Sequence, residues 1–150
     1  MRRQRTLGLV LIALSLATMV GIAAATLPSG VTAEPIGSGT LAKNFKVRQQ
    51  AGLNVVIARF TIEPGGTTGW HTHPGKAVVA ISSGELTLNR VIDGECRTRT
   101  YGPGDGFFEV ATVVHKASNK GDTPLVFGAA LFRIPPSGVT RIDQPNPGVC

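Results

Sequence analysis

The 150-residue chain has room for one ordinary globular domain, and its high pI of about 10.0 reflects 15 basic against 9 acidic residues. Three of the basic residues, Arg2, Arg3 and Arg5, lie at the extreme N-terminus, and without them the net charge falls from +6 to +3. No basic run with interleaved aromatic residues follows, which argues against a nucleic-acid partner.

The first 33 residues have the pattern of an export signal. A basic start precedes the uncharged apolar run 7–27, and small residues at 23–25 and 31–33 are typical of cleavage sites. We predict a signal peptide over 1–33, cleaved after Ala25 or, as we favour, Ala33, and one domain over 34–150 in the periplasm or outside the cell. The alternative is an uncleaved anchor that holds the domain at the membrane, because about 20 apolar residues cross a bilayer.

The two cysteines, Cys96 and Cys150, would meet an oxidising environment after export, where pairing is the usual outcome. We therefore predict a disulfide between them, which would fasten a C-terminal tail rich in Pro and Gly to the domain. The alternative is that one of them is a metal-binding or reactive thiol, although neither cysteine has a neighbouring histidine.

The sequence after the signal predicts an all-β fold. Residues 34–40 indicate an exposed lead-in, and the runs that follow are bounded by Gly, Pro, Asn and Asp. In the run 53–62 we expect Val55, Ile57 and Ile62 in the core and Arg59 in solvent. Frequent turn signals and the absence of a 3.6-residue apolar period indicate a single β-barrel or sandwich. The predicted strands are 41–47, 53–62, 77–82, 85–92, 96–101, 107–110, 112–117 and 125–134.

Two of the three histidines, His71 and His73, lie two residues apart in a strand-like stretch. Side chains at positions i and i+2 of a strand project to the same face, so both imidazoles can reach one metal ion. The third histidine, His115, is far away in sequence and would complete the site only if the fold brings it back.

These histidines lie in two motifs that resemble those of the cupin family. The first cupin motif is Gly, five residues, His, one residue, His, three or four residues, Glu, six residues and Gly. Gly65, His71, His73 and Gly84 match this spacing. The second motif is Gly, five residues, Pro, one residue, Gly, two residues, His, three residues and Asn. Its matching positions here are Gly104, His115 and Asn119.

The sequence departs from the cupin motifs at three positions. Ala77 stands where the family has its glutamate ligand, and Val110 and Thr112 replace the Pro and Gly of a turn. The turn substitutions predict only a local backbone variation, but Ala77 removes a ligand. Glu85 or Glu109 is an alternative fourth ligand, although neither occupies the motif position.

The resemblance implies a jelly-roll β-barrel with a divalent transition metal held by His71, His73 and His115. Iron, zinc, manganese, nickel and copper are all candidate ions. Three protein ligands leave coordination positions open for water or substrate. Without the glutamate the ion would keep its full charge of +2, which favours a small anionic ligand.

Five residues near the motifs are candidate pocket residues. Trp70 is interpreted as core or rim packing, and Ala77 is a possible pocket residue. Phe107 is also a possible pocket residue, because Phe107 and Phe108 point to opposite faces and one of the two enters the barrel core. Lys76 is interpreted as a solvated cation, with a contact to an anionic substrate as the alternative. Asn119 is expected to stabilise a turn, because Asn side chains bind local backbone readily.

The resemblance leaves the activity open, because cupins include enzymes and binding proteins. Likeness to cupin dioxygenases that lack the carboxylate suggests a metal-dependent oxygenase acting on a small anionic substrate, with the metal as its only catalytic group. The alternative is a non-catalytic module that binds a metal or a small ligand, and a purely structural barrel is a third reading. The resemblance also suggests a homodimer formed through sheet packing.

Overall fold

The computed structural model describes residue 30 and residues 32–150, and residues 34–150 form one compact unit. The predicted signal or anchor segment falls almost entirely outside the described residues. Within the part of the chain that is described, no helix has the length and apolar character needed to cross a membrane.

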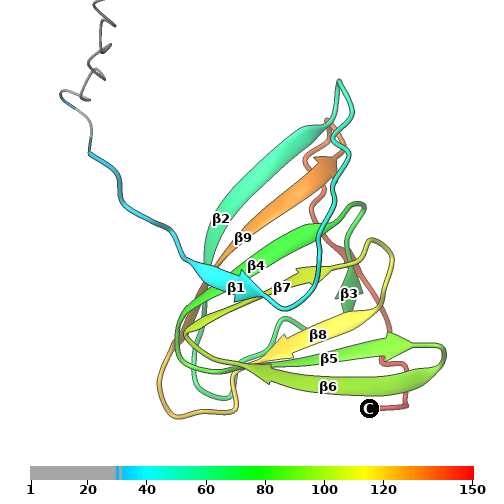
Figure 1. The fold of residues 1–150 in the computed structure, drawn as a ribbon. Helices are drawn as coiled ribbons and strands as arrows, with labels where there is room; N and C mark the ends of the chain where they lie inside the picture. The colour runs from blue at the N-terminus through cyan, green and yellow to red at the C-terminus, as the bar shows by residue number, and fades with distance from the viewer. Residues whose placement is uncertain (1–29, 31) are drawn as a thin grey trace, which may run out of the picture. The chain divides into compact units, whose positions relative to one another are not determined.

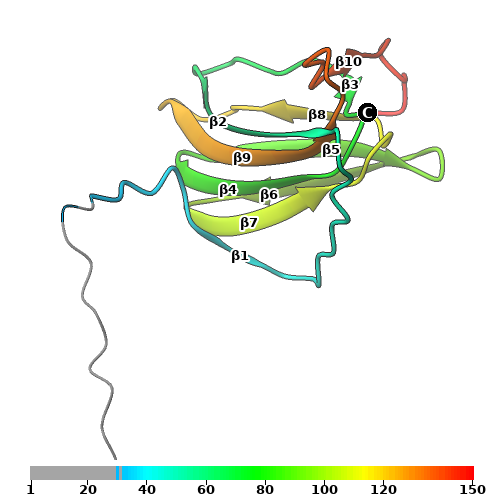
Figure 2. The same cartoon turned by 90° about the horizontal axis from the view of Figure 1, so that it is seen from above.

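Two five-stranded sheets face each other as the layers of a β-sandwich, which confirms the predicted all-β jelly roll (Figure 1 and Figure 2). Neighbouring strands are antiparallel apart from the parallel pair β1–β7. The first sheet has the order β1 (Gly39–Leu41), β7 (Gly104–Glu109), β4 (Ala77–Ser83), β9 (Leu125–Ile134) and β2 (Asn54–Ile62). The second has the order β10 (Ile142–Asp143), β3 (His71–Thr72), β8 (His115–Ser118), β5 (Leu86–Ile92) and β6 (Glu95–Tyr101).

The core lies between the two sheets and follows from alternation along their strands. In β4 the side chains of Ala77, Val79 and Ile81 are buried, while the residues between them are only half-buried. Successive residues of a strand point to opposite faces, so one face of β4 packs inward. The core cluster comprises Ala77, Val79, Ile81, Leu86, Leu88, Tyr101, Phe107, Ala117, Leu125, Phe127, Ala129, Leu131 and Ile134.

The prediction of a strand over 41–47 is wrong. The strand is β1, which begins within the predicted lead-in and ends at Leu41. Gly39 permits this pairing, because a Cβ at that position would lie 2.3 Å from the carbonyl oxygen of Asp105. The segment 42–53 is irregular and is held by side chains instead: the Phe45 ring packs on Phe108 with centroids 5.5 Å apart.

The predicted strand 112–117 is also shorter than expected, because β8 begins only at His115. Thr112 has a positive φ of 68°, in the left-handed region that a β-branched residue rarely adopts. The backbone therefore keeps the conformation of a turn at the position where the cupin motif has glycine.

The expected facing of β2 is wrong for two residues. Val55 and Ile57 are 44% and 65% exposed, on the same side of the strand as the exposed Arg59. Val56 and Ile62 pack against the core instead. Because alternation gives positions 55, 57 and 59 one facing, the two apolar side chains share the solvent face of an edge strand with the arginine.

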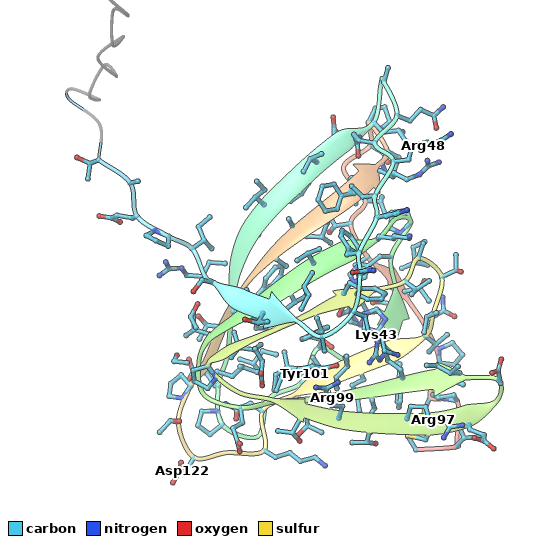
Figure 3. The ribbon with its side chains drawn as sticks, viewed as in Figure 1. Lys43, Arg48, Arg97, Arg99, Tyr101 and Asp122 are labelled. Carbon is cyan, nitrogen blue, oxygen red and sulfur yellow. A yellow bond between two sulfur atoms is a disulfide. The ribbon has the colours of Figure 1, made fainter. Side chains whose placement is uncertain are left out.

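Exposed arginine side chains lie along β6, at the far edge of the second sheet (Figure 3). Arg97 forms an ion pair with Glu95, and the Arg99 guanidinium lies over the Tyr101 ring, 4.8 Å from its centroid. Exposed ion pairs of this kind contribute little to stability, so these residues are best described as solvated surface.

A disulfide joins Cys96 of β6 to Cys150, with their Cα atoms 5.3 Å apart. β10 lies at one edge of the second sheet and β6 at the other, so the tail that follows β10 crosses the sheet to reach its cysteine partner. The tail also pairs with the sheet edge, because the Gln144 amide donates to the Trp70 carbonyl at 3.0 Å. The predicted disulfide therefore fastens the C-terminal segment against the histidine-bearing strands.

Removing this disulfide is expected to destabilise the domain. The bridge closes a loop across 54 residues of sequence, and the chain-entropy model gives about 4 kcal/mol for a loop of this length. Urea unfolding of the domain with and without reductant measures the difference. The Cys96→Ser, Cys150→Ser double variant should match the reduced protein and be insensitive to reductant. A loss below about 1 kcal/mol would contradict the expectation.

Candidate metal centre

Three buried histidines meet at one end of the sandwich interior. His71 begins β3, His73 follows directly after β3, and His115 begins β8. His71 and His115 are partners in the β3–β8 register, and His73 projects to the same side as His71. One ring nitrogen from each histidine lies within 4.8 Å of the others, so the three could hold one metal ion.

Backbone carbonyls fix the orientation of all three imidazoles. Nδ1 of His71, His73 and His115 lies 2.9, 2.6 and 2.8 Å from the carbonyl oxygens of Gly69, Thr140 and Val113, respectively. A carbonyl oxygen only accepts, so each Nδ1 carries the proton and donates it. Each neutral ring then presents an unprotonated Nε2, which is the tautomer that binds a metal.

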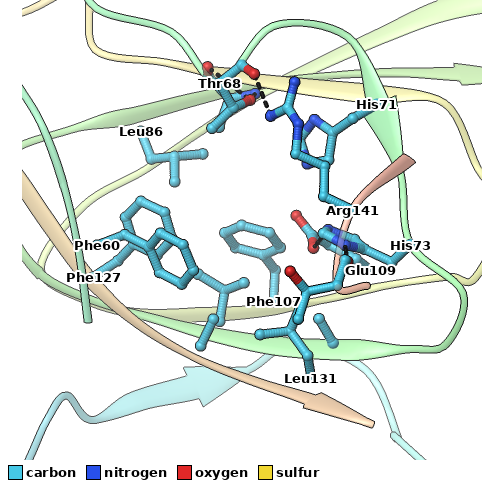
Figure 4. Close-up of a pocket in the computed structure, with 15 residues that line it drawn as sticks. Phe60, Thr68, His71, His73, Leu86, Phe107, Glu109, Phe127, Leu131 and Arg141 are labelled. Carbon is cyan, nitrogen blue, oxygen red and sulfur yellow. Dashed lines mark hydrogen bonds and ion pairs between the residues drawn. The ribbon is translucent and has the colours of Figure 1, made fainter. Parts of the chain in front are cut away.

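Glu109, at the end of β7, brings a buried carboxylate to the same place (Figure 4). Its Oε2 lies 3.0 Å from Nε2 of His73, and its Oε1 lies 3.3 Å from Nε2 of His115. In the β4–β7 register Glu109 is the partner of Ala77, the position of the family glutamate. This chain has no carboxylate at the motif position on β4, but Glu109 provides one on the neighbouring strand β7.

The electrostatics of the cluster favour neutral His71 and ionised Glu109. Burial lowers the pKa of His71 to about 4. Burial also opposes a charge on His73, but the hydrogen bond and negative charge of Glu109 outweigh it and raise the His73 pKa. Burial would raise the pKa of Glu109, yet the hydrogen bonds of His115 and His73 hold it well below its ordinary value.

The donor set fits a divalent transition metal. With each Nδ1 donating to a backbone carbonyl, the three Nε2 atoms and the Glu109 carboxylate face one another in a buried space. Buried acceptors that face one another are costly unless a proton or a cation lies between them. Imidazole nitrogens suit zinc, iron, copper or nickel, and the three histidines could hold one such ion.

A cavity of about 120 Å³ opens from the cluster. Most of its lining is apolar, and Phe60 and Phe127 lie across it from His71 and His73 (Figure 4). Arg141 contributes a positively charged guanidinium group to the residues that line the cavity. The lining residues are Phe60, Thr68, His71, His73, Ala77, Val79, Leu86, Phe107, Glu109, Ala117, Phe127, Ala129, Leu131, Thr140 and Arg141.

A family model described as "Cupin domain" matches residues 58–132, which is half of the chain. The chain belongs to the cupin family. The matched segment runs from β2 to β9 and contains all three histidines and Glu109.

A curated relative and two solved structures show similarity to this cupin. Auxin-binding protein ABP19b of Prunus persica is 31% identical over 94 residues, which cover 61% of this chain but only 44% of the relative. The oxalate decarboxylase of Lactobacillus farciminis, solved as a formate complex, has a TM-score of 0.54 at 24% identity over 61% of this chain and 27% of its own. An oxalate oxidase has a TM-score of 0.52 at 22% identity over 59% and 45%. At these identities the two structures show the fold alone.

Of the five candidate pocket residues, Ala77 and Phe107 line the cavity of this cupin, and the other three do not. The Trp70 ring is buried beneath the Lys116 ammonium, which lies 4.8 Å from its centroid. Lys76 Nζ donates to the carbonyl of Lys46 at 3.0 Å, away from the cavity.

Asn119 holds the turn between β8 and β9 of the cupin. Its Nδ2 donates to the carbonyls of Ile62 and Thr123 at 2.9 and 2.8 Å, and its Oδ1 accepts from the Gly121 amide at 3.0 Å. The side chain therefore satisfies the backbone of its own turn and also joins that turn to the end of β2.

Sequence reasoning missed two lining residues from the C-terminal tail. The Thr140 carbonyl orients His73, and the Arg141 guanidinium donates to the Thr68 carbonyl beside the cavity and pairs with Asp143. No motif covers this irregular segment. The predicted disulfide at Cys150 was the one signal that the tail is fastened to the domain.

His115→Ala should abolish stoichiometric metal in the purified cupin. The change removes one imidazole nitrogen, and even loss of an outer partner of a ligand weakens metal binding by about 10–100-fold. Elemental analysis of protein purified without chelator measures metal per chain. Lys120→Ala, at an exposed position, is the control and should keep the wild-type content. Equal metal in the wild-type and His115→Ala proteins would contradict this assignment.

Proposed function

We propose that this cupin holds a divalent transition metal on His71, His73 and His115 and binds a small organic anion at the remaining positions of the ion. The observation that carries the proposal is the convergence of three buried imidazoles at one end of an apolar cavity. Three histidines with positions left open are typical of a reactive or ligand-binding site.

The cavity supports a ligand with an anionic group and an apolar body. Phe60 and Phe127 stack with centroids 5.1 Å apart and form part of the lining, with Phe107 beside them. Apolar walls favour a hydrocarbon or aromatic group. The positive charge of the ion and the Arg141 guanidinium favour a carboxylate or a similar anion at the other end.

The name of the Prunus persica relative supports a small organic ligand, since that protein is named for binding auxin. The chain spans less than half of that relative, so only the type of site is carried over. We also propose that the domain functions outside the cytoplasm. The export-type N-terminal pattern and the Cys96–Cys150 disulfide support this, because disulfides persist in oxidising compartments.

The second candidate function is oxygenation of the bound anion. An iron ion at the histidines would supply one-electron and oxygen chemistry. The side chains of the chain would position the substrate: Arg141 holds its anionic group, and the phenylalanines hold its apolar part and exclude water. Apart from the histidines and Glu109, the described cavity lining contains no acid or base suited to proton transfer, which favours a reaction in which the metal is the catalytic group.

Benzoate and benzamide give a matched test of the anion proposal. Both have the same apolar ring, but only benzoate carries the charge that the metal and Arg141 would bind. Benzoate should raise the melting temperature of the metal-loaded protein by several degrees when it is well above its dissociation constant. Benzamide should not, benzoate should have no effect on the chelated protein, and its effect on metal-loaded Arg141→Gln should be smaller than on the wild type. Equal shifts with both compounds would contradict the proposal.

Oxygen uptake by the iron-loaded protein separates the two candidate functions. Consumption that depends on an added aromatic or aliphatic acid, and is lost in His115→Ala, supports the oxygenase. Binding of these acids without oxygen uptake supports the binding module.

A further inference from the structure

We propose that Glu109 is the fourth protein ligand of the metal, so that β7 supplies the carboxylate that the cupin motif places on β4. This inference rests on the proposed metal site and assigns a ligand that lies outside both motif positions. It is carried by strand register, by distances and by the direction in which the imidazoles face.

The strand register explains how a carboxylate on β7 can reach the same point as a carboxylate on β4. Ala77 of β4 and Glu109 of β7 are direct antiparallel partners, and both are buried. Side chains of such a pair project to the same face, with Cβ atoms about 4.5–5.5 Å apart. A glutamate on either strand can therefore reach the same point. The small side chain of Ala77 leaves room for the carboxylate of its partner.

The distances match those between ligands of a common ion. Two donor atoms about 2.1 Å from one ion, separated by an angle between octahedral and tetrahedral, lie roughly 3.0–3.4 Å apart. The carboxylate oxygens of Glu109 lie 3.0 Å from His73 Nε2 and 3.3 Å from His115 Nε2. The two oxygens of Glu109 thus lie at ligand spacing from two of the three imidazoles, one oxygen from each ring.

The orientation of the imidazole rings does not fit a Glu109 that only orients a ligating histidine. A carboxylate that only orients a ligating histidine accepts a proton from the ring nitrogen that does not bind the metal. In this site backbone carbonyls already occupy Nδ1 of all three histidines. Glu109 instead faces Nε2 of His73 and His115, the nitrogens that would bind the ion.

The alternative is a structural ion pair between Glu109 and a protonated His73, which needs no metal. Among the charged groups of the described residues, only His73 and His115 lie within ion-pair distance of Glu109. A carboxylate with 8% exposure needs a compensating cation. The alternative carboxylate considered from the sequence, Glu85, is exposed, so the structure favours Glu109 over Glu85.

Ligation by Glu109 changes the charge expected of the centre. With only neutral imidazoles the ion keeps its charge of +2, whereas a glutamate reduces the net charge to +1. The site then has the same ligand types as one with the motif glutamate, and an octahedral ion keeps two positions for an exogenous ligand.

Exchanging the carboxylate between the strands tests the proposal. Zinc affinity is measured by calorimetry on the full chain after chelation, for the wild type, Glu109→Gln and the double variant Ala77→Glu, Glu109→Ala. Glu109→Gln should weaken zinc binding by at least the 10–100-fold typical of outer-shell losses. The double variant should recover to within about tenfold of the wild type, because it restores a carboxylate at the same point. Glu85→Gln is the matched control and should bind as the wild type does.

The outcomes separate this inference from the proposed function. If the wild type binds zinc, His115→Ala does not, and Glu109→Gln binds as tightly as the wild type, the metal site stands and ligation by Glu109 is overturned. If the wild type binds no zinc or cobalt, both fail. The visible absorption of bound cobalt depends on its ligands, so it distinguishes ligation by Glu109 from a structural role. Glu109→Gln should change the spectrum of the cobalt-loaded protein, and the double variant should restore it. Unchanged spectra in a folded Glu109→Gln variant would also overturn the inference.

Discussion

The histidine site depends on three hydrogen bonds from imidazole to backbone. Each Nδ1 of His71, His73 and His115 donates to a carbonyl oxygen, which leaves three Nε2 lone pairs facing one another in a buried space. The Glu109 carboxylate adds further acceptors and no donor. Buried acceptors cannot satisfy one another, so a proton on His73 or a metal ion has to balance the cluster. This requirement, together with the convergence of three histidines, supports a metal centre.

The C-terminal tail completes the site from outside the region matched by the family model. Its Thr140 carbonyl holds the His73 ring, and Arg141 places a guanidinium at the apolar cavity. The pairing of β10 with β3 and the disulfide at Cys150 keep this segment against the second sheet. The proposed ligand site and the stability of the domain are therefore coupled through a stretch of chain that has little regular structure of its own.

Local signals predicted much of the fold, but they could not predict which strands pair. The run 125–134 is found as β9, because a long apolar segment bounded by turns is recognisable from the sequence. The facing of Val55 and Ile57 was wrong, since it depends on which side of β2 packs on the core. Glu109 could not be preferred over Glu85 for a related reason. Its position depends on the β4–β7 register, a long-range pairing that no local motif specifies.

Anomalous diffraction at the metal edge, on crystals of the metal-loaded full-length protein, tests the central claim most directly. The account predicts one ion bounded by Nε2 of His71, His73 and His115, with an oxygen of Glu109 also at a ligand distance of about 2.0–2.2 Å. An ion bound elsewhere on the domain, or histidines that hold no ion after loading, would contradict it.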